Sequence, residues 1–410
     1  MGRDVRQTSA VPDPSAAPPR EIAVLGATGS IGTQALDVIA RSGGRLRAVA
    51  LAAGASSPDL LAEQVARTGA SVVGVTTQAA ATRMLARLDA LGVAHPRTLE
   101  IGENSAAEVA RRGAPIVLNG LAGAAGLSAT AATLTAGATL ALANKESLVI
   151  GGPLITGLAA PGQIVPVDSE HSALAQCLRA GRSDEVARLI LTASGGPFRT
   201  FNRARLRAVT PEQALDHPTW SMGPLVTINS ATLFNKGLEL IEAHLLFGVP
   251  LDRIEVVVHP QSIVHSMVEF WDGSTIAQAS PPDMRLPIAV ALAWPDRVPA
   301  VIAGLDWTRP GQWTFLPLDG TLFPAVDIAR RAAAHGGAAP AVCNAANEVA
   351  VATFLAGGCG FTDIMDLVAA VLADFLADPG TVPATIDDLI ERDRWARARA
   401  RSRLGAAAHG

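Results

Sequence analysis

From Glu21 onwards, short apolar runs alternate with longer amphipathic stretches. The runs of strand length are 22–25, 46–52, 71–75, 116–119 and 139–142. A segment long enough for a helix separates each run from the next, a rhythm typical of parallel strands covered on both faces. The pattern therefore predicts a parallel sheet flanked by helices over residues 21–168.

The pattern changes over residues 169–294. After a short strand at 164–167 we expect a helix at 171–178, a strand at 189–192, a helix at 230–247 and strands around positions 256, 264 and 275. The last three runs follow one another closely, which favours antiparallel pairing. We therefore expect one antiparallel sheet in an α+β second domain.

Three further segments differ from these two in composition. Residues 1–20 are rich in Pro, Ser, Ala and charge, which predicts a disordered tail. Prolines are spread over residues 295–324, which we interpret as a linker. Residues 325–410 are Ala-rich with 3.6-residue periodicity and predict a C-terminal α-helical bundle. The expected fold class is α/β, with three folded parts.

Composition narrows the functional classes. The chain has 410 residues, of which 49% are hydrophobic, and a formal net charge of −4. Its interspersed charges give no reason to expect nucleic acid or a membrane as partner. No apolar run reaches the length of a membrane span, and the tail lacks the features of a signal peptide. Three widely spaced cysteines argue against disulfides, so we expect a cytoplasmic protein.

The rarest charged residue is lysine. Of the 33 lysine and arginine residues, only Lys145 and Lys236 are lysines. Arginine serves solubility equally well, but it does not replace a compact ammonium group in a pocket. Both lysines are therefore site candidates. Because the chain has no tyrosine, reductases with a Tyr-Lys proton donor are excluded.

A glycine motif, Gly26-Ala-Thr-Gly29-Ser-Ile-Gly32, follows the first expected strand and opens the first helix. Glycines allow a sharp turn and close approach of the backbone to a pyrophosphate. The amides of Thr28, Gly29, Ser30 and Ile31 would then face that anion at the helix N-terminus. We interpret the first domain as Rossmann-like and dinucleotide-binding. A mononucleotide site, a sugar-phosphate site and a simple tight turn are the alternatives.

The end of the second expected strand bears on the choice of cofactor. The segment Gly54-Ala55-Ser56 has no acidic residue to hold a free ribose 2′-hydroxyl, which argues against a strict NAD preference. It has no arginine or lysine for a 2′-phosphate either. Because the hydroxyl of Ser56 can donate to that phosphate, the segment favours NADPH.

Two carboxylates follow the strand at 164–167. Asp168 and Glu170 lie two residues apart on an extended segment, so their side chains converge. Converging carboxylates repel one another unless a proton or cation lies between them, and hard oxygen ligands suit Mg²⁺ or Mn²⁺. The same segment is equally typical of a helix N-cap.

A second polar run opens the expected helix at 230–247. Thr232, Asn235, Lys236 and Glu239 fall on one helical face. Together with Ser230, the amide and ammonium groups are suited to bind phosphate. Glu239 lies one turn further on and would complete a metal site of three carboxylates. A solvated helix face is the alternative.

Two segments between these runs also carry polar groups. Ser194 lies in a glycine turn whose amides and hydroxyl suit a phosphate. The run His217-Pro-Thr-Trp220-Ser-Met222 has no strand or helix periodicity, as expected of a flap that closes over a substrate. An ordinary packed loop fits the run equally well.

Taken together, these motifs resemble one family, 1-deoxy-D-xylulose 5-phosphate reductoisomerase. The resemblance covers about residues 21–400. The motifs that occur in family order are Gly-Ala-Thr-Gly-Ser-Ile-Gly, Leu-Ala-Asn-Lys-Glu-Ser-Leu-Val, Val-Asp-Ser-Glu-His-Ser-Ala, Thr-Ala-Ser-Gly-Gly-Pro-Phe, His-Pro-Thr-Trp-Ser-Met-Gly and His-Pro-Gln-Ser-Ile-Val-His-Ser-Met-Val.

The resemblance implies a homodimeric enzyme that uses NADPH and Mg²⁺, Mn²⁺ or Co²⁺. It implies rearrangement and reduction of the sugar phosphate 1-deoxy-D-xylulose 5-phosphate to 2-C-methyl-D-erythritol 4-phosphate in isoprenoid biosynthesis, catalysed by residues 169–294. The metal ligands that it implies are Asp168, Glu170 and Glu239.

The resemblance also assigns the remaining site residues. The substrate contacts are Lys145, Ser169, Glu170, Ser194, His217, Ser230, Asn235, Lys236 and Glu239. The cofactor contacts are Thr28, Gly29, Ser30, Ile31, Gly54, Ala55, Ser56, Asn144, Glu146 and Gly223. The groups expected to act in catalysis are Lys145, Glu170, His217, Trp220 and Met222. Many members carry a basic residue and Asn where this chain has Ala55 and Ser56.

Two other classes fit parts of the pattern. An aspartate-semialdehyde or homoserine dehydrogenase has a similar glycine motif, but the former needs a reactive cysteine, and Cys177 and Cys343 lie in apolar helices. A regulator that binds NADPH without chemistry would not need three clustered carboxylates.

Overall fold

The computed structural model describes residues 18–112, 114–216 and 223–407. Most of the predicted tail therefore lies outside the described residues. So do His217, Trp220 and Met222, the residues expected to form the flap.

The first sheet has seven strands, all parallel, in the order β4-β3-β2-β1-β5-β6-β7. The strands are β1 (Arg20–Leu25), β2 (Leu46–Ala53), β3 (Val72–Val75), β4 (Thr98–Ile101), β5 (Ile116–Asn119), β6 (Thr139–Leu142) and β7 (Ile164–Pro166). The predicted parallel sheet is confirmed. β4 was not predicted, because this edge strand is only partly buried and lacks a continuous apolar run.

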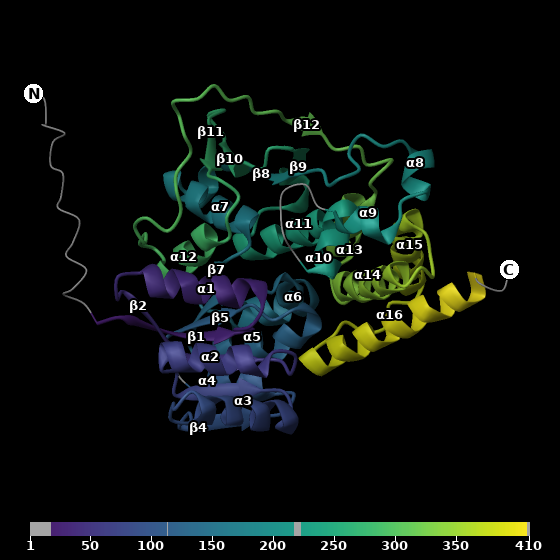
Figure 1. Ribbon diagram of the computed structural model, residues 1–410. Helices are drawn as coiled ribbons and strands as arrows, with labels where there is room; N and C mark the ends of the chain where they lie inside the picture. Colours follow the sequence, from purple (N-terminus) through teal and green to yellow (C-terminus); the bar gives the residue numbers. More distant parts are fainter. Residues whose placement is uncertain (1–17, 113, 217–222, 408–410) are drawn as a thin grey trace, which may run out of the picture.

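Helices cover both faces of this sheet (Figure 1). They are α1 (Ser30–Arg41), α2 (Pro58–Thr68), α3 (Gln78–Ala90), α4 (Ser105–Arg111), α5 (Leu127–Thr135) and α6 (Lys145–Leu158). Ile22 and Val24 pack in one core cluster with α1 and α2, whereas Ala23 and Leu25 pack in another with α4 and α5. Alternate residues of β1 thus point into two separate cores.

The strand order reverses between β1 and β5. The chain passes from β1 outward to β4, then returns to β5 on the other side of β1. In open sheets of this kind, ligands bind outside the carboxyl ends of the strands at the reversal. The motif Gly26 to Gly32 begins at that end of β1.

The second sheet has five strands in the order β11-β10-β8-β9-β12. They are β8 (Val186–Ala193), β9 (Ile254–Val258), β10 (Val264–Phe270), β11 (Thr275–Ala279) and β12 (Leu316–Pro317). The prediction of an antiparallel sheet is wrong, because β8 pairs with β9 in parallel and the sheet is mixed. The long helical connection between these two strands permits that pairing. β12 belongs to the predicted linker and pairs with β9.

The predicted helix at 230–247 is two helices. α10 (Pro224–Ala231) and α11 (Phe234–Phe247) meet at Leu233, whose φ of 61° breaks the helical path. The hydroxyl of Thr232 donates to the carbonyl of Ile228, 3.1 Å away, so Thr232 ends α10 and does not share a face with Glu239. Together with α7 (Ser169–Cys177), α11 covers one face of the second sheet.

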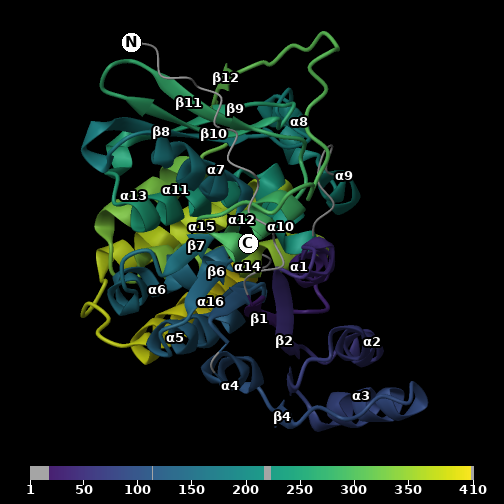
Figure 2. The same ribbon diagram turned by 90° about the vertical axis from the view of Figure 1, so that its left-hand side faces the viewer.

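The C-terminal part of the chain is helical, as predicted. Its helices are α13 (Ala325–His335), α14 (Ala339–Leu355), α15 (Phe361–Ala377) and α16 (Ile386–Ala407), and they pack on α6 and α11. Two short helices, α8 (Arg203–Arg207) and α9 (Pro211–Leu215), lie near α15 and α13 in Figure 1 and at the upper right of Figure 2. None of the helices described is long and apolar enough to cross a membrane.

α12 (Arg285–Ala293) follows β11 of the second sheet but packs on the first sheet. Ile288 and Leu292 are fully buried in the core cluster that also holds residues of α1 and β1. Figure 1 shows α12 beside α1. The division of the chain at 168, 294 and 324 stays a prediction.

Candidate active site

A cavity of about 480 Å³ lies where the start of α1 meets the starts of α6, α7, α11 and α12. The predicted site residues that line it are Ser30, Ile31, Lys145, Asp168, Ser169, Glu170, Ser194, Gly223, Ser230, Asn235, Lys236 and Glu239. Residues more than 200 positions apart in the chain thus share one space. The cavity joins the turn after β1 to the carboxylate cluster.

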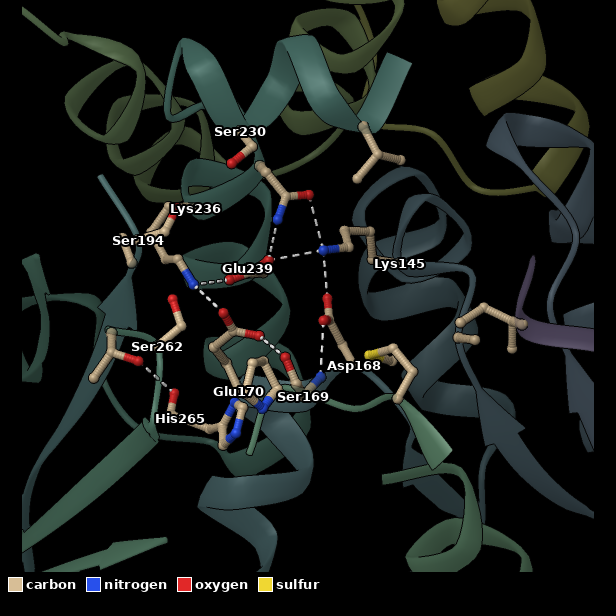
Figure 3. Close-up of a pocket in the computed structure, with 18 of the residues that line it drawn as sticks. Lys145, Asp168, Ser169, Glu170, Ser194, Ser230, Lys236, Glu239, Ser262 and His265 are labelled. Atoms are coloured by element: carbon tan, nitrogen blue, oxygen red, sulfur yellow. Dashed lines mark hydrogen bonds and ion pairs between the residues drawn. The ribbon is translucent and has the colours of Figure 1, made fainter. Parts of the chain in front are cut away.

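Asp168, Glu170 and Glu239 meet in this cavity (Figure 3). One carboxylate oxygen of each lies within 4.8 Å of the other two. Asp168 precedes α7 and accepts from the backbone amide of Ser169 at 2.9 Å, so the predicted N-cap is present as well. The cap uses one oxygen of Asp168, whereas the other oxygen faces the cluster.

Both lysines lie against these carboxylates. Nζ of Lys145 donates to Glu239 at 2.8 Å and to Oδ1 of Asn235 at 2.9 Å, and it pairs with Asp168. Nζ of Lys236 donates to Glu170 at 2.8 Å and pairs with Glu239. Three carboxylates therefore face two ammonium groups, which leaves one negative charge in excess.

The electrostatics of the cluster follow from its burial. Burial opposes the charge on Lys145, but Asp168 and Glu239 outweigh it and hold the pKa of Lys145 well above its ordinary value. Burial also raises the pKa of Glu170, yet Lys236 outweighs that effect and the pKa of Glu170 falls below its usual value. The charged forms of both residues are therefore favoured in this cavity.

The cluster fits a divalent cation. Oδ2 of Asp168 and Oε2 of Glu239 are buried and accept no hydrogen bond of good geometry from the described residues. Three carboxylates with excess negative charge supply the hard oxygen ligands that Mg²⁺ and Mn²⁺ prefer. The residues that would hold the ion are the three predicted from the sequence.

A second buried pair lies directly beneath the cluster. Nδ1 of His171 is 3.0 Å from a carboxylate oxygen of Glu242, and its Nε2 is 2.9 Å from the carbonyl oxygen of Glu239. Neither side chain is exposed. Burial opposes the charge on His171, but Glu242 outweighs it and raises the pKa of His171 to about 9. The pair ties α7 to α11 and so fixes the spacing of the three carboxylates.

Three sequence profiles match the chain. The profile described as 1-deoxy-D-xylulose 5-phosphate reductoisomerase matches residues 22–152, and two profiles of its C-terminal domains match residues 164–247 and 279–399. A protein of that name from Pseudarthrobacter chlorophenolicus is 56% identical over 392 residues, covering 94% of this chain and 98% of the relative. The chain belongs to the 1-deoxy-D-xylulose 5-phosphate reductoisomerase family. The predicted resemblance is therefore confirmed.

Relatives from other genera agree with this assignment. The reductoisomerase of Mycobacterium avium is 57% identical over 389 residues, which cover 94% of this chain and 93% of the relative. The Zymomonas mobilis reductoisomerase, solved in complex with NADPH, superposes with a TM-score of 0.86 at 42% identity, covering 94% of this chain and 99% of that one.

A second solved reductoisomerase holds NADPH, fosmidomycin and magnesium. It superposes with a TM-score of 0.87 at 36% identity, and the match covers 95% of this chain and 100% of that chain. The cofactors predicted from the sequence, NADPH and a divalent metal, agree with the ligands of these two relatives.

The predicted phosphate residues of this reductoisomerase-family chain lie together in the cavity. Ser194 lies in the turn after β8, Ser230 lies near the end of α10, and Asn235 and Lys236 begin α11. Figure 3 shows Ser194, Ser230 and Lys236 on one side of the carboxylate cluster. The break at Leu233 turns the start of α11 toward this space.

The predicted cofactor residues are more scattered. Ser30, Ile31 and Gly223 line the cavity, but seven others do not: Thr28, Gly29, Gly54, Ala55, Ser56, Asn144 and Glu146. Asn144 is buried and caps α6, and its Nδ2 donates to the carbonyl of Gly123 and to Glu146 at 2.9 and 2.8 Å. Its polar atoms thus hold the loop after β5 in place.

The motif glycines have steric reasons for their identity. Gly26 has a φ of +79°, and a Cβ there would lie 2.6 Å from the carbonyl oxygen of Gly120. A Cβ on Gly32 would lie 2.2 Å from the carbonyl oxygen of Gly26. A Cβ on Gly29 would lie 3.2 Å from that same oxygen, a tight but less severe contact. The tight-turn interpretation therefore explains Gly26 and Gly32 more fully than Gly29.

Several other residues line the cavity, and the sequence assigned none of them a site role, although five fall within the family motifs (Ala143, Thr192, Ala193, Ser262 and His265). The whole set is Gln34, Ala143, Thr192, Ala193, Val226, Leu233, Ser262, His265, Pro282, Asp283, Met284 and Arg285. Backbone strain marks two of them, because Leu233 and Ser262 have positive φ values of 61° and 50°. Such strain is concentrated at functional sites, but it is invisible in sequence.

Cys177 and Cys343 do not suit the nucleophilic role that an aspartate-semialdehyde dehydrogenase requires. Burial raises the pKa of Cys177 to about 11 and that of Cys343 to about 12. A nucleophilic cysteine needs a thiolate near neutral pH, and these environments disfavour it.

Proposed function

We propose that this protein converts 1-deoxy-D-xylulose 5-phosphate to 2-C-methyl-D-erythritol 4-phosphate, with NADPH as reductant and a divalent metal as cofactor. The observation that carries the proposal is the cluster of three carboxylates and two lysines in a cavity that reaches the glycine turn of β1. Family membership agrees with it.

We assign Asp168, Glu170 and Glu239 as the metal ligands. A divalent ion bound there polarises substrate oxygens and stabilises the negative charge that develops on them. Lys145 adds positive charge at the same place, because its ammonium group already contacts Asp168 and Glu239. Ser169 donates to Glu170 at 2.5 Å and so holds that carboxylate beside the substrate.

The substrate phosphate is assigned to Ser194, Ser230, Asn235 and Lys236. A phosphate held there is remote from the reacting carbons, so its binding energy can orient the substrate and exclude water. His217, Trp220 and Met222 are assigned to the flap that covers it, with His217 near the phosphate. These three assignments rest on the family motif.

We assign NADPH to the crevice at the reversal of the first sheet. Thr28, Gly29, Ser30 and Ile31 would hold its pyrophosphate through backbone amides. The segment Gly54 to Ser56 is exposed and follows β2, where the adenine ribose of a dinucleotide lies in such folds. Asn144, Glu146 and Gly223 are assigned as further cofactor contacts on the strength of the family motifs.

A homodimer and a cytoplasmic location are also part of the proposal. Large apolar side chains are exposed on the second sheet and the segment that crosses it: Trp271, Ile276, Trp307, Phe315 and Leu316. β11 is an edge strand with an unpaired side. A second copy of the chain would cover this apolar edge.

The test is NADPH consumption with 1-deoxy-D-xylulose 5-phosphate, followed by absorbance with and without a chelator. Turnover should require Mg²⁺ or Mn²⁺, and Glu239→Gln should lower kcat/KM by roughly a thousandfold because it removes a ligand charge. NADPH affinity should stay within about twofold, because the pyrophosphate site is separate. Equal loss of both properties would contradict the separate sites, and metal-independent turnover would contradict the proposal.

A further inference from the structure

Arg285 lines the active-site cavity, but it belongs neither to the carboxylate cluster nor to the predicted phosphate residues. It opens α12, the helix that returns from the second sheet to pack beside α1. A cation at a helix N-terminus is opposed by the helix dipole, so the position does not serve the stability of α12. At this end of the cavity, Arg285 shares the lining with Ser30, Ile31 and Gln34 of α1.

The carboxylates beside Arg285 hold it only loosely. Its Nε lies 3.6 Å from Asp37 and 3.5 Å from Asp283, longer than the 2.7–2.9 Å typical of charge-assisted hydrogen bonds. Asp37 has a closer partner in Arg41 at 2.8 Å, and Asp283 accepts from the backbone amide of Arg285 at 2.9 Å. The guanidinium group therefore retains donors for a further anion.

The other cations of the cavity are differently placed. Lys145 and Lys236 line it too, but each contacts two carboxylates of the metal cluster. At the α1 end the described lining includes no other Lys or Arg side chain. The start of α1 has no acidic residue in its first turn and no side-chain cap, and its residues Ser30 and Ile31 line the same cavity as Arg285.

We propose that Arg285 binds the phosphate on the nicotinamide side of the NADPH pyrophosphate, opposite the amides of Ser30 and Ile31. The cavity continues from these residues to Lys145 and Asp168, so the nicotinamide half of the cofactor must pass Arg285 to reach the substrate. A guanidinium group matches a phosphate through two parallel hydrogen bonds. The inference rests on the proposed use of NADPH.

The experiment measures NADPH affinity by fluorescence titration of the full chain without metal or substrate. Arg285→Met should weaken NADPH binding by about tenfold or more, the effect of losing one charge-assisted contact. Arg285→Lys should recover part of the loss. Arg41→Met is the matched control, because it removes a cation that pairs with the same Asp37 outside the cavity lining, and its affinity should match the wild type.

A second ligand separates the two halves of the cofactor. Because 2′,5′-ADP lacks the nicotinamide-side phosphate, Arg285→Met should bind it as tightly as the wild type does, which also shows that the variant is folded. Equal weakening of both ligands, or unchanged NADPH affinity, would overturn the inference. Failure of the wild type to bind NADPH would instead refute the proposed function.

Discussion

The two lysines of this chain occupy positions that suit lysine better than arginine. Nζ of Lys145 contacts oxygens of Asp168, Asn235 and Glu239, and Nζ of Lys236 contacts Glu170 and Glu239. A single nitrogen can donate in three directions, whereas the planar guanidinium group of arginine is larger and donates in one plane. Composition alone therefore drew attention to two residues that line the cavity.

Glu146 is a partly buried carboxylate whose titration can be followed. Burial is the main cause that raises the pKa of Glu146 from its ordinary value of 4.5 to about 6. A raised pKa in a carboxyl group means that its ionised form opposes folding. Compared with a variant that carries a neutral side chain at this position, the wild type therefore loses free energy of unfolding as the pH rises from about 4.5 through about 6.

We expect Glu146→Gln to be more stable than the wild type by about 2 kcal/mol at pH 7, and to be nearly equal to it at pH 4. Urea denaturation at a series of pH values measures this difference. Glu391→Gln, at an exposed position of α16, is the control and should show no such trend. If the difference in unfolding free energy between the two proteins does not vary between pH 4 and 7, burial does not raise the pKa of Glu146.

Among the elements, those with a continuous apolar run or a clear helical period were predictable. β4 has neither, because it is a partly buried edge strand. The parallel pairing of β8 with β9 depends on how four helices between them pack, which the local pattern does not encode. The break between α10 and α11 rests on one residue, Leu233, whose left-handed backbone has no sequence signature.

α16 is joined to the rest of the molecule by a half-buried ion-pair network. Arg397 donates to Glu348 of α14 at 2.6 Å and pairs with Asp393 on its own helix. Nδ2 of Asn344 donates to the same Glu348 at 3.0 Å. A Cβ on Gly123, in the loop after β5, would lie 3.6 Å from Oε1 of Glu348. The network therefore ties the C-terminal helix to α14, near the loop after β5.

Arg397→Ala should lower the free energy of unfolding by about 2–3 kcal/mol, because it leaves two partly buried carboxylates without their cation. Arg399→Ala is the matched control on the same helix. Its partner Asp374 keeps Arg403, so the loss should stay below about 1 kcal/mol. Urea denaturation gives both values, and equal losses would show that the network does not stabilise the helix.

For the whole molecule, the apolar edge of the second sheet predicts how two copies associate. Trp271 lies in the turn between β10 and β11 and is 66% exposed. Trp271→Glu should place a charge in the proposed dimer interface and shift the protein to a monomer, as measured by light scattering after gel filtration. Val382→Glu is the control, because Val382 is also exposed but lies between α15 and α16.

A dimer that survives Trp271→Glu unchanged, while Val382→Glu dissociates it, would place the interface on the helical part instead. A wild-type monomer would contradict the dimer itself.

The site as a whole was predictable where its residues fall in short motifs. The motifs around Lys145, Asp168, Ser194 and Lys236 supplied the carboxylates, the lysines and the predicted phosphate residues of the cavity. No local pattern marked Met284 and Arg285 as site residues. They follow β11 in the chain, and only the return of α12 to α1 brings them to the cavity. Long-range placement of this kind depends on tertiary packing and not on local pattern.

The return of α12 also constrains how the chain is made. Ile288 and Leu292 complete a core whose other members lie mostly before residue 168. A nascent chain that has emerged only to the end of β7 therefore exposes part of that apolar surface to water. The first sheet and its helices, although encoded first, can complete this core only after residues 285–293 have left the ribosome.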